Sequence, residues 1–86
     1  MDISRKLKVM ELFAGVGGFR LGFERANKDF FDVNWANQWE PARKRQDAFS
    51  CYTKRFKTGV HVNKDIATIP DEEFAKAMPD LVVGGF

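Results

Sequence analysis

A cluster of three glycines is the first candidate for chemistry in this sequence of 86 residues. Gly15, Gly17 and Gly18 follow an apolar run, Lys8–Phe13, that is typical of a short β-strand, and they precede a helical pattern. Such a turn lets a ligand approach the backbone, and the free N–H groups of the following helix favour an anion. A dinucleotide-binding turn would have its third glycine at position 20, which is Arg20, so an amino-acid carboxylate fits better than a pyrophosphate. The alternative is a tight turn that only allows close packing.

Polar and aromatic residues follow the next two predicted strands and could complete a binding site. Glu40 lies about 20 residues after the glycines, where an acidic side chain commonly binds ribose, and Trp39 could lie flat on a purine ring. Asp65 could accept a hydrogen bond from a purine amine, and Ile66 could donate its backbone N–H to a ring nitrogen. The alternatives are a helix-start charge for Glu40, a core position for Trp39 and a loop cap for Asp65. Together these residues predict a nucleoside pocket at the carboxyl edge of a parallel sheet.

Strand and helix patterns alternate along the chain and would position these residues. The predicted strands are Lys8–Phe13, Asp32–Asn37, Val60–Asn63 and Leu81–Val83. A second helix is expected from Glu40-Pro41 to Thr58-Gly59, and a third from Pro70 to Met78. The first helix has one apolar face, formed by Phe19, Gly22, Phe23, Ala26 and Phe30, whereas Arg20, Glu24, Arg25 and Lys28 fall on other faces. This βαβαβαβ order predicts an α/β fold with a mainly parallel sheet.

Length and composition allow one small domain, residues 1–86, and exclude several classes of protein. An apolar fraction of 44% and a charged fraction of 30% argue against disorder. The sequence has neither an apolar run long enough for a membrane span nor a signal peptide, so we expect a cytoplasmic protein. A single cysteine, Cys51, and a single histidine, His61, exclude an internal disulfide and a zinc site. No histidine lies near Cys51 in the sequence, and we expect neither residue to do chemistry.

Charge is distributed unevenly. Residues 1–64 contain 13 Lys/Arg and 7 Asp/Glu, whereas residues 65–86 contain one and five. The basic residues at Arg43–Arg45 and Lys54-Arg55 are explained by a solvated helix face or, alternatively, by a phosphate-binding patch. A net charge of +2 is too small to identify a nucleic-acid partner, although the basic first part is compatible with one.

Four segments together resemble one family. The run Met10–Gly22, with its acidic-Leu-Phe-x-Gly-x-Gly-Gly core, resembles the first motif of the DNA (cytosine-5)-methyltransferases. Asn37–Glu40 is similar to the second motif, Lys64–Ile66 to the third, and Asp80–Phe86 to the approach to the fourth. The resemblance covers about residues 7–86, and its first motif is far more specific than a generic glycine loop.

The resemblance implies the N-terminal part of an S-adenosylmethionine-dependent methyltransferase fold, which is Rossmann-like. Phe13 would pack against the adenine side of the cofactor, Trp39 would contact adenine, and Asp65 and Ile66 would bind its amino edge. The implied cofactor-binding residues are Phe13, Ala14, Gly15, Val16, Gly17, Gly18, Gln38, Trp39, Glu40, Asp65, Ile66, Gly85 and Phe86. The family usually has Glu where this sequence has Gln38, so Gln38 and Glu40 are both candidates for the ribose ligand.

The resemblance also implies the activity of the intact protein, which is methylation of cytosine C5 in duplex DNA by a bacterial restriction–modification or orphan enzyme. The family's nucleophile is the cysteine of a Pro-Cys pair that would come after Phe86, so we expect no catalytic residue in this chain and a fragment that is inactive alone. The alternative is a natural split or degenerate subunit that assembles with a second polypeptide. In the family, the fourth strand lies beside the first and a fifth covers its far edge, so Leu81–Val83 would be an exposed edge that promotes self-association.

Overall fold

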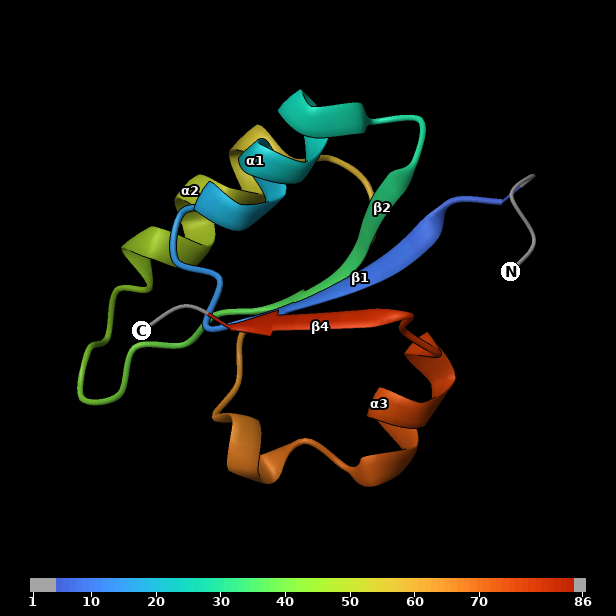
Figure 1. Cartoon of the computed structure of the whole chain (residues 1–86). Helices are drawn as coiled ribbons and strands as arrows, with labels where there is room; N and C mark the ends of the chain where they lie inside the picture. The colour runs from blue at the N-terminus through green and yellow to red at the C-terminus, as the bar shows by residue number, and fades with distance from the viewer. Residues whose placement is uncertain (1–4, 85–86) are drawn as a thin grey trace.

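The computed structural model describes residues 5–84, which form a four-stranded sheet with helices on both faces (Figure 1). The strands are β1 (Leu7–Leu12), β2 (Phe31–Asn37), β3 (Val60–Val62) and β4 (Leu81–Gly84), in the order β3-β2-β1-β4. Each pair of neighbouring strands is parallel. The α/β class, the parallel sheet and the position of the fourth strand beside the first are confirmed.

The helices cover the two faces of the sheet. α1 (Gly18–Asn27) and α2 (Asp47–Arg55) lie on one face, and α3 (Asp71–Ala77) lies on the other (Figure 1). A 3₁₀ turn at Ile66–Thr68, which no pattern in the sequence predicts, precedes α3. None of the helices within residues 5–84 has the length and apolar character to cross a membrane.

The predicted start of the second helix at Glu40-Pro41 is wrong, because α2 begins at Asp47. The Gln46 side chain accepts a hydrogen bond from Glu40 N at 2.7 Å and donates one to Glu40 O at 2.9 Å, which closes residues 40–46 into a loop. Ala42 has a φ of 65°, a left-handed conformation that a helix cannot contain. A proline and an acidic residue favour a helix start locally, but the Gln46 contacts outweigh that preference.

Two apolar clusters hold the helices against the sheet. The buried cluster facing α3 contains Met10, Trp35, Val62 and Ile69. The buried cluster facing α1 and α2 contains Ala14, Ala36, Tyr52 and Phe56. Alternation along β1 sends Met10 to the α3 side and its neighbour Glu11 to the opposite side, where α2 lies.

A buried polar network connects β1, α1 and α2. Glu11 is 0% exposed, and its Oε1 accepts a hydrogen bond from Tyr52 Oη at 3.0 Å. Arg20, the buried residue of α1, places its guanidinium 4.5 Å from the centre of the Phe56 ring and donates to Thr58 Oγ1 at 2.8 Å. The packing face of α1 therefore includes an arginine, whereas Phe19 from the apolar face remains 45% exposed.

The Glu11 carboxyl is not fully compensated by this network. Its second oxygen, Oε2, is buried without a hydrogen-bond partner among residues 5–84. Burial raises the pKa of Glu11. The hydrogen bond from Tyr52, the backbone N–H groups of Arg20 and Phe19 and the charge of Arg20 lower the pKa only in part. The folded protein consequently holds a proton on Glu11 to a higher pH than the unfolded chain does.

Replacing Glu11 with Gln should make the free energy of unfolding less dependent on pH. Because the pKa is raised on folding, the contribution of Glu11 is fully present below the pKa of an unfolded Glu and is lost as the pH rises through the raised value. In urea unfolding at a series of pH values, the free energy of unfolding of Glu11→Gln should rise relative to that of the wild type as the pH increases from about 4 to 8. A difference that stays constant with pH would contradict the assignment. Tyr52→Phe keeps the carboxyl but removes a hydrogen bond that lowers its pKa, so this variant should show a larger pH dependence and be destabilised by about 1–3 kcal/mol.

Candidate functional site

A groove of about 960 Å³ runs along α1 from the carboxyl ends of β1 and β2 to Phe31, at the start of β2. Its walls are the loop from Phe13 to Gly17 (the glycine loop) with Gly18, one face of α1, Phe31 and the residues that follow β2. The lining residues are Phe13, Ala14, Gly15, Gly18, Phe19, Gly22, Phe23, Ala26, Phe31, Gln38 and Trp39. A mostly apolar wall with few polar groups and a volume of this order is typical of sites for small molecules.

The loop from Phe13 to Gly17 turns the chain sharply between β1 and α1. Phe13, Gly15 and Gly17 all have positive φ, at 53°, 58° and 96°. A Cβ on Gly17 would lie 2.2 Å from Phe56 Cε2 and 3.1 Å from Tyr52 Cδ2, so the backbone at this position packs directly on α2. Glycine at position 17 is required both by the backbone conformation and by the space available.

Hydrogen bonds fix the glycine loop to the end of β2. Ala14 N donates to Asn37 O at 3.0 Å, and Gly15 N donates to Gln38 Oε1 at 2.7 Å. The Gln38 backbone is held in turn by β3, since its N–H donates to Val62 O at 3.0 Å. The two sides of the groove are therefore parts of one hydrogen-bonded unit.

The structure brings six of the predicted site residues together in the groove. They are Phe13, Ala14, Gly15, Gly18, Gln38 and Trp39. Trp39 is 37% exposed and Phe13 is 45% exposed, so both rings present surface to a ligand. Gln38 is the one of these six residues with a polar side chain. Its Oε1 accepts the hydrogen bond from Gly15 N, and its Nε2 is the second polar atom of the same amide.

The remaining predicted residues lie elsewhere. Val16 is exposed outside the groove lining, and Gly17 packs on α2. The Glu40 carboxylate lies 3.4 Å from Arg43 and accepts from Ala48 N at 3.4 Å, at the start of α2. Asp65 caps the 3₁₀ turn by accepting from Ala67 N at 3.0 Å, and Ile66 packs on the cluster facing α3. Gly85 and Phe86 lie outside the described residues.

Two sets of groove-forming residues were not identified as site residues from the sequence. The first set is the apolar face of α1 together with Phe31. The helical spacing of the apolar residues indicated this face but not that it lines a groove. The second is a pair of amides behind the groove: Asn37 Nδ2 donates to Lys64 O at 2.9 Å, and Asn63 Nδ2 donates to Gln38 O at 2.7 Å. No spacing in the sequence indicates such contacts, because an amide can bond many partners.

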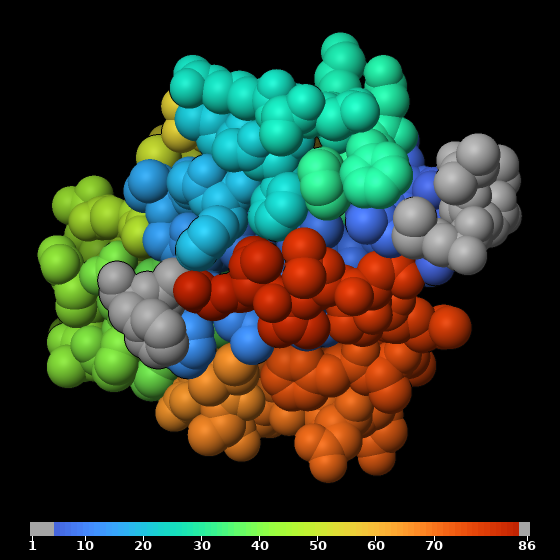
Figure 2. Space-filling model, in the orientation of Figure 1, coloured from blue at the N-terminus to red at the C-terminus, as the bar shows by residue number. Residues whose placement is uncertain are grey.

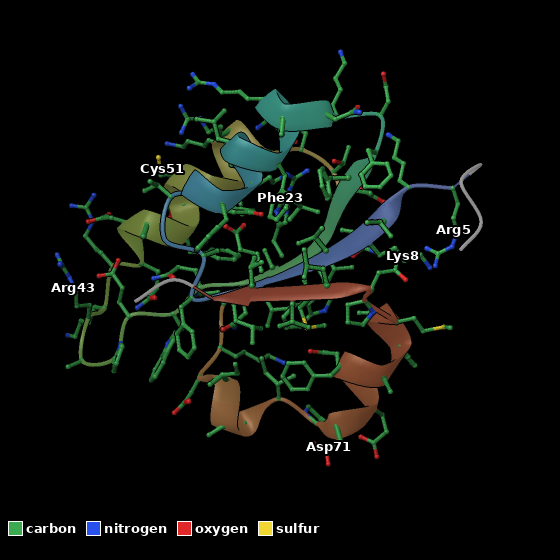
Figure 3. The ribbon with its side chains drawn as sticks, viewed as in Figure 1. Arg5, Lys8, Phe23, Arg43, Cys51 and Asp71 are labelled. Carbon is green, nitrogen blue, oxygen red and sulfur yellow. The ribbon has the colours of Figure 1, made fainter. Side chains whose placement is uncertain are left out.

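Cys51 and His61 lie outside the groove lining. Cys51 is exposed on α2 (Figure 3). It lines a separate depression together with Lys54. His61 Nε2 lies 3.0 Å from Thr58 O, and the imidazole meets the Tyr52 ring edge-on with ring centres 5.2 Å apart. Within residues 5–84, no three His, Cys, Asp or Glu side chains are grouped closely enough to hold a metal ion.

Comparison with known proteins gives a consistent family. The family model described as C-5 cytosine-specific DNA methylase matches residues 7–86. The chain is 64% identical to Type II methyltransferase M.Sau3AI of Staphylococcus aureus over 81 aligned residues. This alignment covers 94% of this chain and 20% of that protein. The chain is 35% identical over 79 residues to Type II methyltransferase M.FnuDI of Fusobacterium nucleatum, which covers 92% of this chain and 20% of that protein. The chain thus spans about a fifth of the length of these relatives. No solved structure matches it significantly.

Replacing Gly17 with Ala should destabilise the protein by about 1–3 kcal/mol, because the new methyl group would meet Phe56 and the residue would keep a φ of 96°. Gly22→Ala is the matched control, since nothing lies within 4 Å of its added Cβ inside α1. That variant should be neutral or more stable by about 0.5–1 kcal/mol. Urea unfolding of both variants tests the difference, and equal effects would show that Gly17 has no special packing role.

Proposed function

Because the chain belongs to the C-5 cytosine-specific DNA methylases, we propose that its groove binds S-adenosylmethionine for an enzyme that methylates cytosine C5 in duplex DNA. The observation that carries the proposal is the hydrogen bond from Gly15 N to Gln38 Oε1, which joins two family motifs around one groove. The cofactor supplies the methyl group, and the residues of this chain hold it.

The groove residues fit the two ends of such a cofactor. Trp39 and Phe13 offer exposed aromatic surface, which suits a purine ring. The first turn of α1 begins with the groove residues Gly18 and Phe19, and its N-cap residue, Gly17, has no side chain to cap the helix. The backbone N–H groups of Phe19 and Arg20 face the buried Glu11 carboxyl. Because the positive end of a helix favours a carboxylate, we assign the methionine end of the cofactor to the glycine loop on this side.

We assign the ribose to Gln38 rather than to Glu40. Gln38 lines the groove, and its Nε2 lies on the other side of the amide from the Oε1 that binds Gly15. Glu40 is absent from the groove lining and contacts Arg43 and the start of α2 instead. Asp65 and Ile66 remain the proposed partners of the adenine amino edge, although they contribute nothing to the described groove wall.

Cys51 is not proposed as the nucleophile, because it lies on α2 outside the groove lining. The cysteine that attacks cytosine, and the residues that recognise the DNA target, would come from the rest of the catalytic domain or from a complementing subunit. On this proposal the 86-residue chain binds cofactor but does not methylate DNA alone.

Replacing Trp39 with Ala should weaken binding of S-adenosylmethionine to the chain at least 10-fold, since loss of aromatic stacking on a base costs about 1–3 kcal/mol. Trp39→Phe should retain most of the affinity. Phe30→Ala is the matched control, because Phe30 is 36% exposed and absent from the groove lining. Calorimetric titration measures all four proteins, and an effect of Phe30→Ala as large as that of Trp39→Ala would refute the assignment.

We also propose that the chain self-associates through β4. This strand pairs with β1 at one edge of the described sheet, and it lies exposed across the face in Figure 2, with Val82 52% exposed. An unpaired apolar edge favours pairing with another copy.

A lysine at Val82 should therefore shift the chain towards monomer in sedimentation velocity. Val60→Lys is the matched control, because Val60 is 53% exposed on β3, a three-residue strand at the opposite edge. It should leave association unchanged. A wild-type chain that stays monomeric at every concentration would exclude the β4 contact.

A further inference from the structure

The segment between β2 and α2 is a loop with a fixed shape. Gln46 accepts hydrogen bonds from Glu40 N at 2.7 Å and from Asn63 Nδ2 at 3.1 Å. Its Nε2 donates to Glu40 O at 2.9 Å and to Arg43 O at 2.8 Å. One amide thus makes four contacts that close the loop and join it to the end of β3. Ala42 in this loop has the left-handed φ of 65°, the kind of strained conformation that clusters at functional sites.

This segment, residues 41–46 and hereafter the basic loop, contains three consecutive cationic residues. Arg43, Lys44 and Arg45 are all exposed, with Arg45 86% exposed at its side chain. Arg43 and Arg45 each have a carboxylate at 3.4 Å, whereas Lys44 makes no ion pair within residues 5–84. Ion pairs of that length are weak when the cation is exposed, as both arginines are, so all three cations remain available to a partner.

The basic loop and α2 carry more than the whole positive charge of the protein. Residues 40–57 contain six Lys/Arg and two Asp/Glu, and the rest of the chain contains eight Lys/Arg and ten Asp/Glu. The cations of α2 and the residues after it are Lys54, Arg55 and Lys57, all exposed. Lys54 lines a depression together with Arg45 of the basic loop, so cations of both elements share one surface. Such a surface attracts a polyanion, even though the net charge of the chain is only +2.

The basic loop lies on the side of the molecule where the reaction would occur. It follows Trp39, a groove residue, and it projects past the end to which the β4 arrow points (Figure 1). In Figure 3, Arg43 and Cys51 lie towards this end, whereas Arg5 and Lys8 lie at the opposite end. The carboxyl edge of a parallel sheet is the edge at which ligands bind.

We propose that the basic loop, with the neighbouring cations of α2, binds the phosphate backbone of duplex DNA. The proposal rests on the proposed function, because it takes the DNA substrate as the polyanion. Arginine matches phosphate with paired donors, and a fixed loop loses little entropy when it binds. The loop contains no aromatic residue for stacking on bases, which favours a duplex backbone over a single strand.

The test compares two variants of equal charge for binding to a short labelled duplex by fluorescence anisotropy. The loop variant combines Arg43→Gln, Lys44→Gln and Arg45→Gln. The control variant combines Lys6→Gln, Lys28→Gln and Lys76→Gln, three exposed positions outside the basic loop and α2. Each lost phosphate contact should flatten the dependence of log affinity on log salt by about 0.9. The loop variant should therefore show a slope flatter by about 2–3 and an affinity at least 10-fold lower at ~50 mM salt.

The control variant should keep the wild-type slope to within about 1. Equal losses in both variants would show a general charge effect and overturn the proposal, as would an unchanged loop variant or tighter binding of a single strand. Circular dichroism checks the fold, and the single variant Lys44→Glu replaces the triple variant if that one unfolds. Cofactor titration of the loop variant separates the two proposals, because its S-adenosylmethionine affinity should equal that of the wild type. Loop-dependent DNA binding by a wild-type chain without cofactor affinity would refute only the proposed cofactor site.

Discussion

The hydrogen bond between Tyr52 Oη and Glu11 Oε1 is the contact on which the groove depends, because it joins the first strand to the second helix where water has no access. Tyr52 also forms part of the surface against which Gly17 packs. A shift of α2 would move that surface, and the glycine loop would move with it. The network is demanding, since a buried carboxyl with one unpaired oxygen is costly unless every other contact is made. The same cost favours a single arrangement of β1, α1 and α2.

From this anchored loop, hydrogen bonds continue across the ends of three strands. Gly15 binds the Gln38 side chain, the Gln38 backbone binds Val62 and Asn63, and Asn63 binds Gln46. β3 contributes no residue to the groove wall, yet it fixes the residue that does. Small amide side chains suit this task, because each provides a donor and an acceptor without a charge that burial would penalise. One connected set of hydrogen bonds therefore holds both the groove and the basic loop in place.

The residue patterns predicted the four strands and their alternation with helices, because short apolar runs bounded by turn residues favour strands. The place of β4 beside β1 was implied only by the family resemblance, since no local pattern reports which strands pair. The sequence predicted the wrong start for α2, because the decisive contacts of Gln46 join backbone groups that no periodicity reports. It also could not indicate which face of α1 packs inward. Helical periodicity shows which residues share a face, but the neighbouring elements determine which face is buried. Arg20 is buried because its guanidinium donates hydrogen bonds to Tyr52 and Thr58 and stacks on Phe56. Six of the thirteen predicted cofactor residues lie together in the groove: Phe13, Ala14, Gly15, Gly18, Gln38 and Trp39. Their roles in cofactor binding stay predictions.

The exposed aromatic face of α1 couples the stability of this small chain to whatever occupies the groove. Phe19 is 45% exposed and Phe13 is equally so, although burial of such a side chain stabilises a protein by about 1.5–3 kcal/mol. A domain of this size has a total stability of only about 5–15 kcal/mol, so two exposed phenylalanines are a large fraction of what folding could gain. A ligand that covers them would bury this surface, and any ligand that binds only the folded chain stabilises it by about 2.7 kcal/mol at 100 times its dissociation constant. The aromatic residues that line the groove therefore leave the fold less stable than its composition would allow.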